Sequence, residues 1–454
     1  MHKVMTYPEH VRAIMTLGLP LIGGHIAQTA IGVTDTVMLG WYGVEALAAV
    51  TLGSTFYFVL FIFGSGFAWA VMPMVASFHA EEDETSLRRA TRMGLWLSTG
   101  FAMLALPVMV WSEPVLRALG QSEMLAANAG AYLRVAGFAI LPALLVMVIK
   151  SYLAALERTQ VVLWITVFSA VVNGVANYAF IFGNWGAPEL GITGAAIATL
   201  STNVCALIGI VAYAHFALPQ HTLFQRLWRA DWKMLAQVFR LGWPISLTGL
   251  SEVGLFAASA MMMGWLGTVP LAAHGIALQL ASITFMVHMG LSNAATIRAG
   301  NAYGRHDPWH MQKGALVVLV LSLSVAAITV VLFLLFPDLL ISLFIQKEEV
   351  ERDAILTIGA GLLAMAALFQ LLDGAQVIAL GLLRGIQDTR VPMICAALSY
   401  WIVGVPCSYI FGFVLGFDGI GVWMGLVIGL GLAGVLLSLR FWRYRLPELK
   451  ASGA

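Results

Sequence analysis

The sequence predicts an all-α integral membrane protein, in which twelve transmembrane helices form two six-helix lobes related by a parallel internal repeat. Three observations support this fold class: the composition, the apolar runs and an internal repeat. The chain of 454 residues is 60% hydrophobic and only 10% charged, whereas soluble domains contain roughly 25% charged residues. Because so few charges cannot cover a soluble protein of this size, lipid must be the solvent for most of the surface.

The internal repeat is visible by direct alignment of the chain with itself. Residues 16–50 align without a gap with residues 240–274, and ten of the 35 positions are identical. Pro20 and Pro244 are among the identical pairs. A period close to half the chain length indicates a duplicated domain rather than a solenoid.

Twelve apolar runs are long enough to cross a bilayer, which takes about 20 residues. In the first half they lie near residues 13–37, 46–76, 92–111, 130–153, 161–183 and 191–216, and in the second half near residues 237–265, 270–297, 314–336, 354–383, 391–415 and 419–439. The shorter breaks between them carry turn residues such as glycine and asparagine. The longest polar stretch predicts a linker at 217–236 between an N-terminal lobe, 1–216, and a C-terminal lobe, 237–454.

The loop charges predict the orientation of the chain. If the N-terminus is cytoplasmic, nearly all of the 24 Lys and Arg residues lie on the cytoplasmic side or at helix ends facing it. The exceptions are Arg117, Arg134, Lys347 and Arg352. This bias satisfies the positive-inside rule. Six spans per half is an even number, so both termini are predicted inside and the halves share one orientation.

Composition and motifs exclude several classes of function. The net charge is only +1, and the basic residues are dispersed, so no nucleic-acid partner is expected. Cys205, Cys395 and Cys407 lie in apolar runs and offer no disulfide framework. The chain has no Walker loop, no GxSxG motif and no zinc-ligand spacing. We therefore expect neither an enzyme nor a cofactor, and transport would have to run on an ion gradient.

Three acidic residues, Asp35, Glu252 and Asp373, fall inside predicted spans. Each costs about 2.5–3.5 kcal/mol at a helix centre, which marks it as a functional candidate. Glu252 and Asp373 share the second half, where we expect no Lys or Arg within a span to neutralise them. Such a pair either holds a proton or takes up a metal cation such as Na⁺, and both outcomes suit ion coupling. The alternative is a structural hydrogen bond between helices, worth about 0.6 kcal/mol.

The first half offers a second polar group. Asp35 aligns with Ser259 and Gln28 with Glu252, so the two copies differ in charge at both positions. Asn173 and Asn177, four residues apart, share one helix face. They could form a substrate cavity with Asp35 and Gln28, or simply a hydrogen bond between helices. Asp35 itself could act as a local cap near the interface.

Other residues allow two interpretations. Phe285 and Met286 suit either an adaptable apolar wall of a substrate cavity or a lipid-facing surface. His25 and His288 lack metal-ligand spacing and are predicted to be satisfied core histidines.

Each half has a proline at the same position of its opening helix, Pro20 and Pro244. An internal proline removes a backbone hydrogen bond and kinks a helix. We interpret both as candidate hinges, although a proline bend can equally be static.

These features resemble a known family. Leu17-Gly18-Leu19-Pro20 and the segment Thr34-Asp35-Thr36-Val37-Met38 resemble the first helix of multidrug and toxic compound extrusion (MATE) transporters. Glu252 together with Asp373 resembles the NorM branch of that family. The similarity spans the whole chain, including the span count, the duplicated halves and the central linker.

The resemblance implies export of cationic, amphipathic compounds in exchange for Na⁺ or H⁺ by alternating access. It implies that Glu252 and Asp373 form the cation site, and that Asp35, Asn173 and Asn177 line a substrate cavity. We accordingly expect a monomer in the bacterial inner membrane, with lipid and small lipophilic cations as its partners.

The sequence departs from the family pattern at two positions. Asn177 stands where the DinF-like branch tends to carry aspartate, which puts a proton site of that type in doubt. Phe369 stands where some NorM relatives have tyrosine, so a cation would be held by the ring face rather than by a hydroxyl.

An alternative function is a flippase for a lipid-linked precursor on the same scaffold. A flippase of that kind needs a cationic cavity for phosphates, whereas the charges within these spans are acidic. The sequence therefore favours cationic substrates.

The first prediction concerns topology. Because the basic residues are so unequally divided, reporter fusions in the 217–236 linker and at the C-terminus should both report a cytoplasmic location. A periplasmic signal at either fusion would remove one span and end the argument for a parallel repeat.

Overall fold

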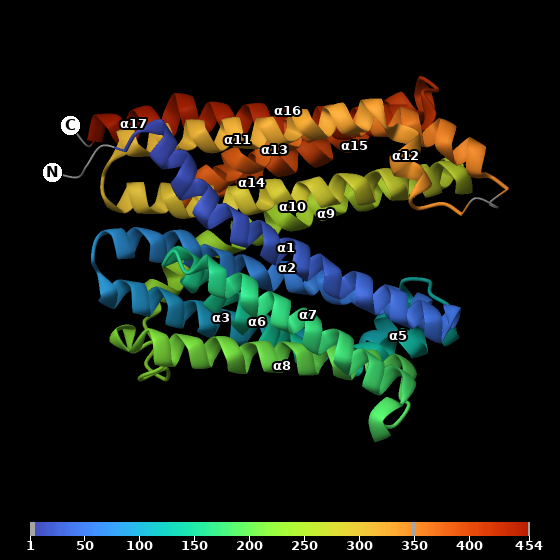
Figure 1. Cartoon of the computed structure of the whole chain (residues 1–454), viewed down its shortest axis with the longest axis horizontal. Coiled ribbons are helices and arrows are strands. Elements are labelled where there is room, and N and C mark those ends of the chain that lie inside the picture. Colours follow the sequence, from blue (N-terminus) through green and yellow to red (C-terminus); the bar gives the residue numbers. More distant parts are fainter. Residues whose placement is uncertain (1–4, 347–349, 453–454) are drawn as a thin grey trace. The chain divides into compact units, whose positions relative to one another are not determined.

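The computed structural model describes residues 5–346 and 350–452, and Lys347 lies outside these residues. Within them the chain is helical and contains no strand (Figure 1). Twelve helices are long and apolar enough to cross a membrane, which confirms the predicted fold class. They are Tyr7–Tyr42 (α1), Val44–Ala80 (α2), Glu84–Val110 (α3), Glu123–Ala155 (α5 to α6), Thr159–Phe182 (α7), Gly191–Ala217 (α8), Trp232–Leu266 (α9), Thr268–Gly304 (α10), Pro308–Leu335 (α11), Arg352–Gly385 (α13), Arg390–Val414 (α14 to η5) and Asp418–Ser452 (α16 to α17).

Several spans combine shorter segments, and short helices precede two of them. The segments are α5 (Glu123–Ala136), η1 (Gly137–Ala139), α6 (Ile140–Ala155), α14 (Arg390–Ala397), η4 (Leu398–Gly404), α15 (Val405–Tyr409), η5 (Ile410–Val414), α16 (Asp418–Leu439), η6 (Arg440–Arg445) and α17 (Leu446–Ser452). The short helices are α4 (Ser112–Ala118) and α12 (Pro337–Ser342). Most helices extend beyond the predicted apolar runs, because polar residues outside the bilayer continue a helix until a cap ends it.

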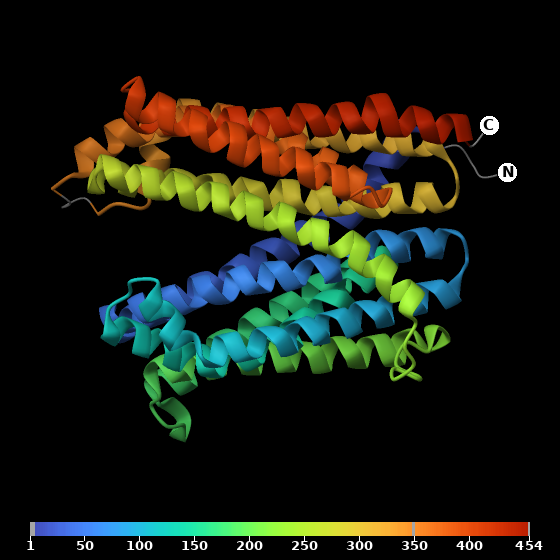
Figure 2. The ribbon, with the colours of Figure 1, turned by 180° about the vertical axis from the view of Figure 1, so that it is seen from behind.

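The backbone repeats between the halves as the sequence does. Asp83 caps the start of α3, and Asp307, 224 positions later, caps the start of α11, each accepting a hydrogen bond from the backbone N–H three residues on. The preceding residues, Glu82 and His306, both have left-handed backbone angles, with φ of 59° and 53°. Figure 2 shows both turns, each joining two helices that lie side by side. The turn geometry is therefore conserved between the copies although the residues differ.

The chain divides into two compact units at positions that differ from the predicted lobe boundaries. Unit 2 is Gly23–Ser246, and unit 1 combines Met1–Ile22 with Leu247–Ala454. Both divisions lie inside long helices, α1 and α9, and each follows two residues after the internal proline, Pro20 or Pro244. The opening segment of each half thus belongs to the unit formed mainly by the other half. Hydropathy locates the linker but carries no information on this exchange.

A glycine contact holds each exchanged segment in place. In unit 1, a Cβ on Gly290 of α10 would lie 2.8 Å from the backbone nitrogen of Ile22. In unit 2, a Cβ on Gly66 of α2 would lie 2.6 Å from the backbone nitrogen of Ser246. Gly66 and Gly290 are again 224 positions apart. A small residue is required at both positions, because it lets two helix backbones approach closely in lipid.

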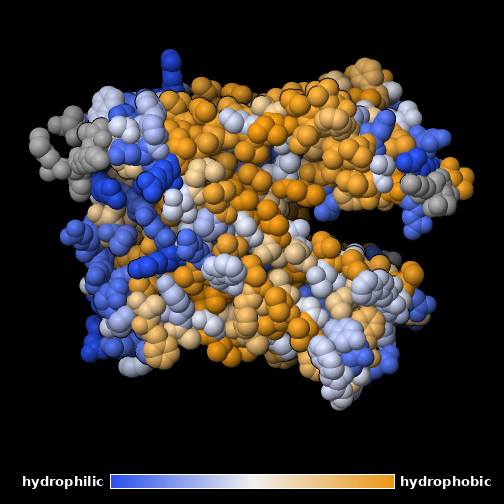
Figure 3. Space-filling model, viewed as in Figure 1, coloured by the Kyte–Doolittle hydropathy of each residue, from blue (hydrophilic) through white to orange (hydrophobic). Residues whose placement is uncertain are grey.

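The surface of the helices fits a lipid environment. Figure 3 shows hydrophobic residues over the middle of the helices, and hydrophilic residues gathered where the α2–α3 and α10–α11 turns lie. The start of α1 and the end of α17 lie at the α10–α11 end of unit 1, since Tyr7 lies near Lys313 and Lys450 donates to Gln312 at 2.6 Å. Both ends of the described chain are thus on the same side of that unit.

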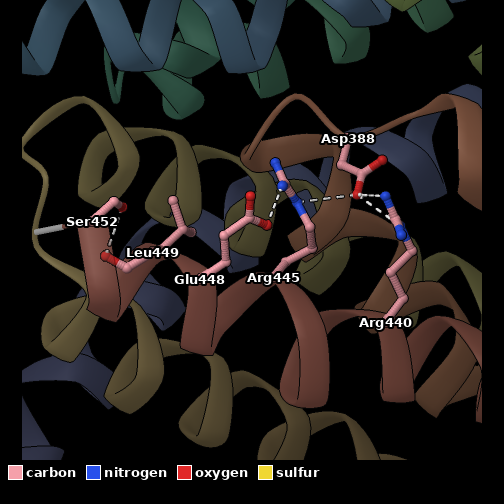
Figure 4. Close-up of polar contacts among 6 residues, drawn as sticks. All are labelled: Asp388, Arg440, Arg445, Glu448, Leu449 and Ser452. Carbon is pink, nitrogen blue, oxygen red and sulfur yellow. Dashed lines mark hydrogen bonds and ion pairs between the residues drawn. The ribbon is translucent and has the colours of Figure 1, made fainter.

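An ion-pair network fixes the C-terminal segment within unit 1 (Figure 4). Asp388, in the turn between α13 and α14, accepts from both Nε and Nη2 of Arg440 at 2.8 Å. Arg445 lies 3.3 Å from the same carboxylate oxygen and pairs with Glu448 at 2.6 Å. Because several charges share one nearly buried carboxylate, this network restrains the segment more than an isolated surface pair would.

The polar linker is fastened to unit 2. Arg92 of α3 donates to the backbone oxygens of Thr222 and Leu223, both at 2.7 Å. Arg88 donates to the Thr222 hydroxyl at 2.6 Å, and Trp96 donates to the Leu227 carbonyl at 2.7 Å. Charged donors on backbone carbonyls form strong hydrogen bonds. The linker is therefore a bound segment rather than a free tether.

His221 anchors the linker start. Its Nδ1 lies 2.5 Å from the hydroxyl of Tyr152, and both side chains are buried. Burial lowers the pKa of His221 below its usual value, because the charged imidazole is poorly solvated there. The pair therefore favours the neutral form of His221 near neutral pH.

The second prediction tests this attachment. Arg92→Ala removes two charge-assisted hydrogen bonds, each worth about 1.5–3 kcal/mol, so local opening of the linker should increase at least tenfold. Limited trypsin cleavage within 217–236 measures that opening. Arg89→Ala is the matched control, since Arg89 is 54% exposed and lies 3.7 Å from Asp231. Equal cleavage of the two variants would show that the contacts do not restrain the linker.

Candidate functional site

Asp373 is the most unusual charged residue within the spans. Its side chain lies on α13 in unit 1 and is only 1% exposed. Within the described residues neither carboxylate oxygen has a hydrogen-bond partner. A buried ionised carboxylate without a partner is costly, and the binding of a proton or a cation at Asp373 stays a prediction.

Two glutamines flank Asp373 on the same helix. The amide nitrogen of Gln370 donates to the Ala281 carbonyl at 3.0 Å, and that of Gln376 donates to the Tyr400 hydroxyl at 2.7 Å. These bonds fix the orientation of both amides, and both amide oxygens lack a partner among the described residues. Carboxylate and amide oxygens are ligands that hard cations prefer.

Glu252, on the unit 1 part of α9, is half-buried, and its charge acts on that of Asp373. It also interacts electrostatically with Arg384, near the end of α13. The expectation that no basic residue within a span of this half would neutralise the acidic pair was therefore wrong for Glu252. The apolar run was predicted to end at residue 383, whereas the helix continues to Gly385. A long arginine side chain at a helix end can reach back along the helix.

Tyr400 is a further member of the group that the sequence did not reveal. It is completely buried in η4, and the charges of Glu252, Asp373 and Arg384 all act on it. A tyrosine in an apolar run cannot be recognised as a site residue from the sequence, because the run does not show which helix face points inward.

Phe369 lies one turn before Asp373 and is 3% exposed. Its ring makes edge contacts with Phe256 and Trp423, with centroids 6.0 and 5.8 Å apart. Phe369 is thus part of the hydrophobic core of unit 1. Its role in holding a cation stays a prediction.

Unit 2 brings together three of the four polar residues predicted for the substrate cavity. Asn177 donates to Asp35 at 2.5 Å and to Asn173 at 3.2 Å, joining α1 to α7. Both asparagines are buried, whereas Gln28 is exposed and is not part of this network. Tyr132 of α5 also interacts electrostatically with Asp35, which the sequence did not predict.

The remaining predicted residues are dispersed. Phe285 and Met286 are half-buried on α10. His288 is completely buried, its Nδ1 lies 2.8 Å from the Ser322 hydroxyl oxygen, and its side chain also interacts with Gln370. His25 interacts electrostatically with Lys150.

Neither a metal cluster nor a cavity locates the site. The described residues contain no group of three or more His, Cys, Asp and Glu that could hold a metal ion. A cation at Glu252 and Asp373 would therefore need amide or water oxygens as further ligands. A cavity of about 680 Å³ lies in unit 1, with Asp338 and Asp353 among its lining residues, and no predicted site residue lines it.

Solved structures share this fold. A structure titled as MATE in complex with MaL6 has a TM-score of 0.87 and 22% identity, covering 97% of both chains. A structure titled as the outward-facing conformation of a multidrug resistance MATE family transporter has a TM-score of 0.86 and 22% identity, covering 99% of this chain and all of the other. At this identity the likeness shows the fold alone.

Sequence relatives are closer. A protein of Rhizobium meliloti (strain 1021) named "Probable multidrug resistance protein NorM" is 44% identical, covering 96% of this chain and 94% of the relative. A protein of the same name from Agrobacterium fabrum is 44% identical and covers 98% and 96%. The MatE family model matches residues 20–179 and 244–410, one match in each half. The resemblance to MATE transporters of the NorM branch is thereby confirmed, and the chain belongs to the MatE family.

Proposed function

We propose that this protein is a secondary active exporter of cationic amphipathic compounds, driven by exchange with Na⁺ or H⁺ through alternating access. The observation that carries the proposal is Asp373, a completely buried carboxylate with two unpartnered oxygens. A permanent structural role would leave its desolvation uncompensated. Transient binding of cations, by contrast, needs a site of this kind.

Charge balance favours one exchanged cation at a time. Glu252 and Asp373 together carry two negative charges when ionised, and Arg384 supplies one permanent positive charge. A single monovalent cation then neutralises the group, and a cationic drug and a coupling ion would compete for it. Na⁺ would be held by Glu252 and Asp373, with Phe369 beside them and the flanking amide oxygens as added ligands.

The residues of unit 2 would form the other part of the substrate route. Asp35, held by Asn177 and Asn173, offers a second negative charge, and Gln28 lies exposed on the same helix. Phe285 and Met286 would supply adaptable apolar contacts in unit 1. Pro20 and Pro244 would act as hinges, since each lies two residues from a division between the compact units.

The names of the relatives support drug export, because both are described as multidrug resistance proteins. The fold alone does not identify the substrate, because proteins of this fold can differ in function. One solved structure of the same fold, from Pyrococcus furiosus, is titled as having a binding pocket of reverse polarity that suggests a different function. The choice between drug export and lipid flipping therefore depends on the sign of the charges within the spans. Here these charges are acidic, which disfavours a flippase of phosphate-bearing lipid precursors.

We further propose a monomer in the bacterial inner membrane with cytoplasmic termini. The proposal includes no cofactor other than the coupling ion.

The third prediction concerns the two carboxylates. Asp373→Asn and Glu252→Gln should each reduce gradient-driven drug efflux at least tenfold in vesicles, because the coupling cation loses its charged ligand. Asp353→Asn, an exposed residue on the same helix, is the matched control and should transport normally.

Thermal unfolding should separate the two carboxylate variants. Asp373→Asn removes an unpartnered charge and should be at least as stable as the parent protein, whereas Glu252→Gln leaves Arg384 without that negative charge and should be less stable. Normal efflux by both neutral variants would place ion coupling elsewhere.

The fourth prediction concerns substrate sign and competition. Cells expressing the protein should tolerate ethidium-like or fluoroquinolone-like compounds better than control cells, but not anionic detergents of similar size. Binding of the coupling ion should weaken drug binding by the same factor that drug weakens ion binding. Drug affinity measured across a series of Na⁺ concentrations and pH values tests this. An affinity independent of both ions would contradict exchange.

A further inference from the structure

The linker and the first turns of α9 form an exposed basic surface on unit 2. Between residues 217 and 246 the chain has four basic residues and one acidic residue, Asp231, so this stretch carries a formal charge of +3 with histidine neutral. The basic residues, all exposed, are Arg226, Arg229, Lys233 and Arg240. Within the described part of the chain, none of these four side chains pairs with a carboxylate.

Asp231 does not neutralise this surface. One of its carboxylate oxygens accepts a hydrogen bond from the backbone N–H of Met234 at 3.1 Å and so caps the start of α9. The other carboxylate oxygen lies 3.7 Å from Arg89 of α3. Both oxygens are thus engaged elsewhere, and the charge of the four basic side chains is left uncompensated.

α3 adds positive charge where the linker is attached. Arg88 and Arg92 both donate hydrogen bonds to Thr222 of the linker. Arg92 also interacts electrostatically with Arg88 and Arg226. Because like charges repel, gathering three guanidinium groups in one place is unfavourable unless an anion lies beside them. The positive potential of this surface therefore suits an anionic partner.

Tryptophan side chains lie between the basic residues. Trp228 is 78% exposed and Trp232 is 70% exposed. Trp96 of α3 donates from its indole nitrogen to the Leu227 carbonyl at 2.7 Å, which fixes the backbone directly before Trp228. Tryptophan is enriched where membrane helices leave the hydrocarbon for the headgroup layer, because its ring is apolar and its N–H is polar. The exposed rings thus favour contact with lipid.

The first turns of α9 arrange aromatic and basic side chains in two neighbouring rows. Trp232 and Phe239 are seven residues apart, and so are Lys233 and Arg240, which puts each pair on one helix face over about 10 Å. All four side chains are exposed, whereas Val238 is completely buried in unit 2. A phospholipid has a matching arrangement, since its acyl chains adjoin a charged phosphate.

The position of this surface fits the headgroup layer of a membrane. α3 and α9 are both long and apolar enough to cross a bilayer, and the surface lies near the start of each helix. Figure 2 shows the linker at the end of unit 2 that carries the α2–α3 turn, where hydrophilic residues gather in Figure 3. A soluble phosphate would gain nothing from the exposed rings, so the combination favours a lipid.

We propose that the linker and the first turns of α9 bind the headgroup of an anionic phospholipid, with the basic side chains on its phosphate and the tryptophan rings beside its acyl chains. The occupant is a membrane lipid of net negative charge, for which phosphatidylglycerol is the probe. The bound lipid joins α3, the linker and α9 at one end of unit 2. This site is separate from the one proposed for export, and its test does not depend on transport.

The fifth prediction is a lipid preference. The full-length protein in detergent is titrated with phosphatidylglycerol or with phosphatidylcholine of the same acyl chains, and native mass spectrometry gives the dissociation constant of the first bound lipid. Phosphatidylglycerol should bind roughly tenfold more tightly, because its charge is attracted to the basic surface. Raising ammonium acetate from about 0.05 M to about 0.5 M should reduce this preference roughly threefold, because salt screens exposed charges.

Two arginines give the decisive variant. Arg226→Gln combined with Arg229→Gln should lower the preference for phosphatidylglycerol roughly fivefold and leave the affinity for phosphatidylcholine unchanged, because only the charge attraction is lost. The matched control combines Arg305→Gln with Arg443→Gln. These two residues are exposed basic residues of unit 1, so the control has the same change in net charge. It should keep the preference of the parent protein.

The tryptophans test the lipid contact. Trp228→Ala combined with Trp232→Ala should weaken the binding of both lipids by a similar factor, about threefold, because each lipid loses apolar contact with the rings. The salt dependence of the phosphatidylglycerol preference should stay as in the parent protein, because the basic residues are retained.

Three results would overturn the proposal. The first is equal affinity of the parent protein for the two lipids, and the second is an equal preference in the Arg226 and Arg229 variant and in its control. The third is displacement of phosphatidylglycerol by glycerol phosphate at the same concentration, since the surface would then bind a soluble phosphate. If the tryptophan variant does not fold, the arginine variant and the salt series decide between these outcomes.

Discussion

The close helix approach at Gly66 and Gly290 is the contact on which the organisation of both compact units depends. In each case a side chain would collide with the backbone of the opening segment of the other half, and only glycine avoids this. Each contact lies inside one compact unit and joins it to the opening segment of the other half. As a result the chain passes between the units inside α1 and α9, so any rearrangement of one unit against the other must bend or rotate these two helices.

The duplicated halves have kept their backbone geometry and changed their chemistry. The left-handed turn residues and aspartate caps recur at equivalent positions. At one further pair of equivalent positions, unit 2 has Asp35 bonded to Asn177, while unit 1 has Ser259 bonded to the Phe256 carbonyl and near His274. At this pair the copies differ in charge inside a span, where a charge in a low dielectric has a large effect.

Sequence patterns predicted the parts of this protein that follow from hydropathy and spacing. The twelve spans follow from apolar length, and Asn173 with Asn177 follows from the four-residue spacing that puts both on one helix face. The interaction of Arg384 with Glu252, and of Tyr400 with the acidic pair, depends on the rotation of each helix about its axis. Hydropathy does not encode that rotation when lipid and protein interior are both apolar.

The exchange of opening segments has a consequence for how such a chain can arise. Two copies of one half, each lending its first fifteen or so helical residues to the other, would complete the same two units, with each proline at the point of departure. The duplicated protein therefore has the architecture of an arm-exchanged dimer joined into a single chain. Seen this way, the linker joins the two copies covalently, so each copy can specialise without losing its partner.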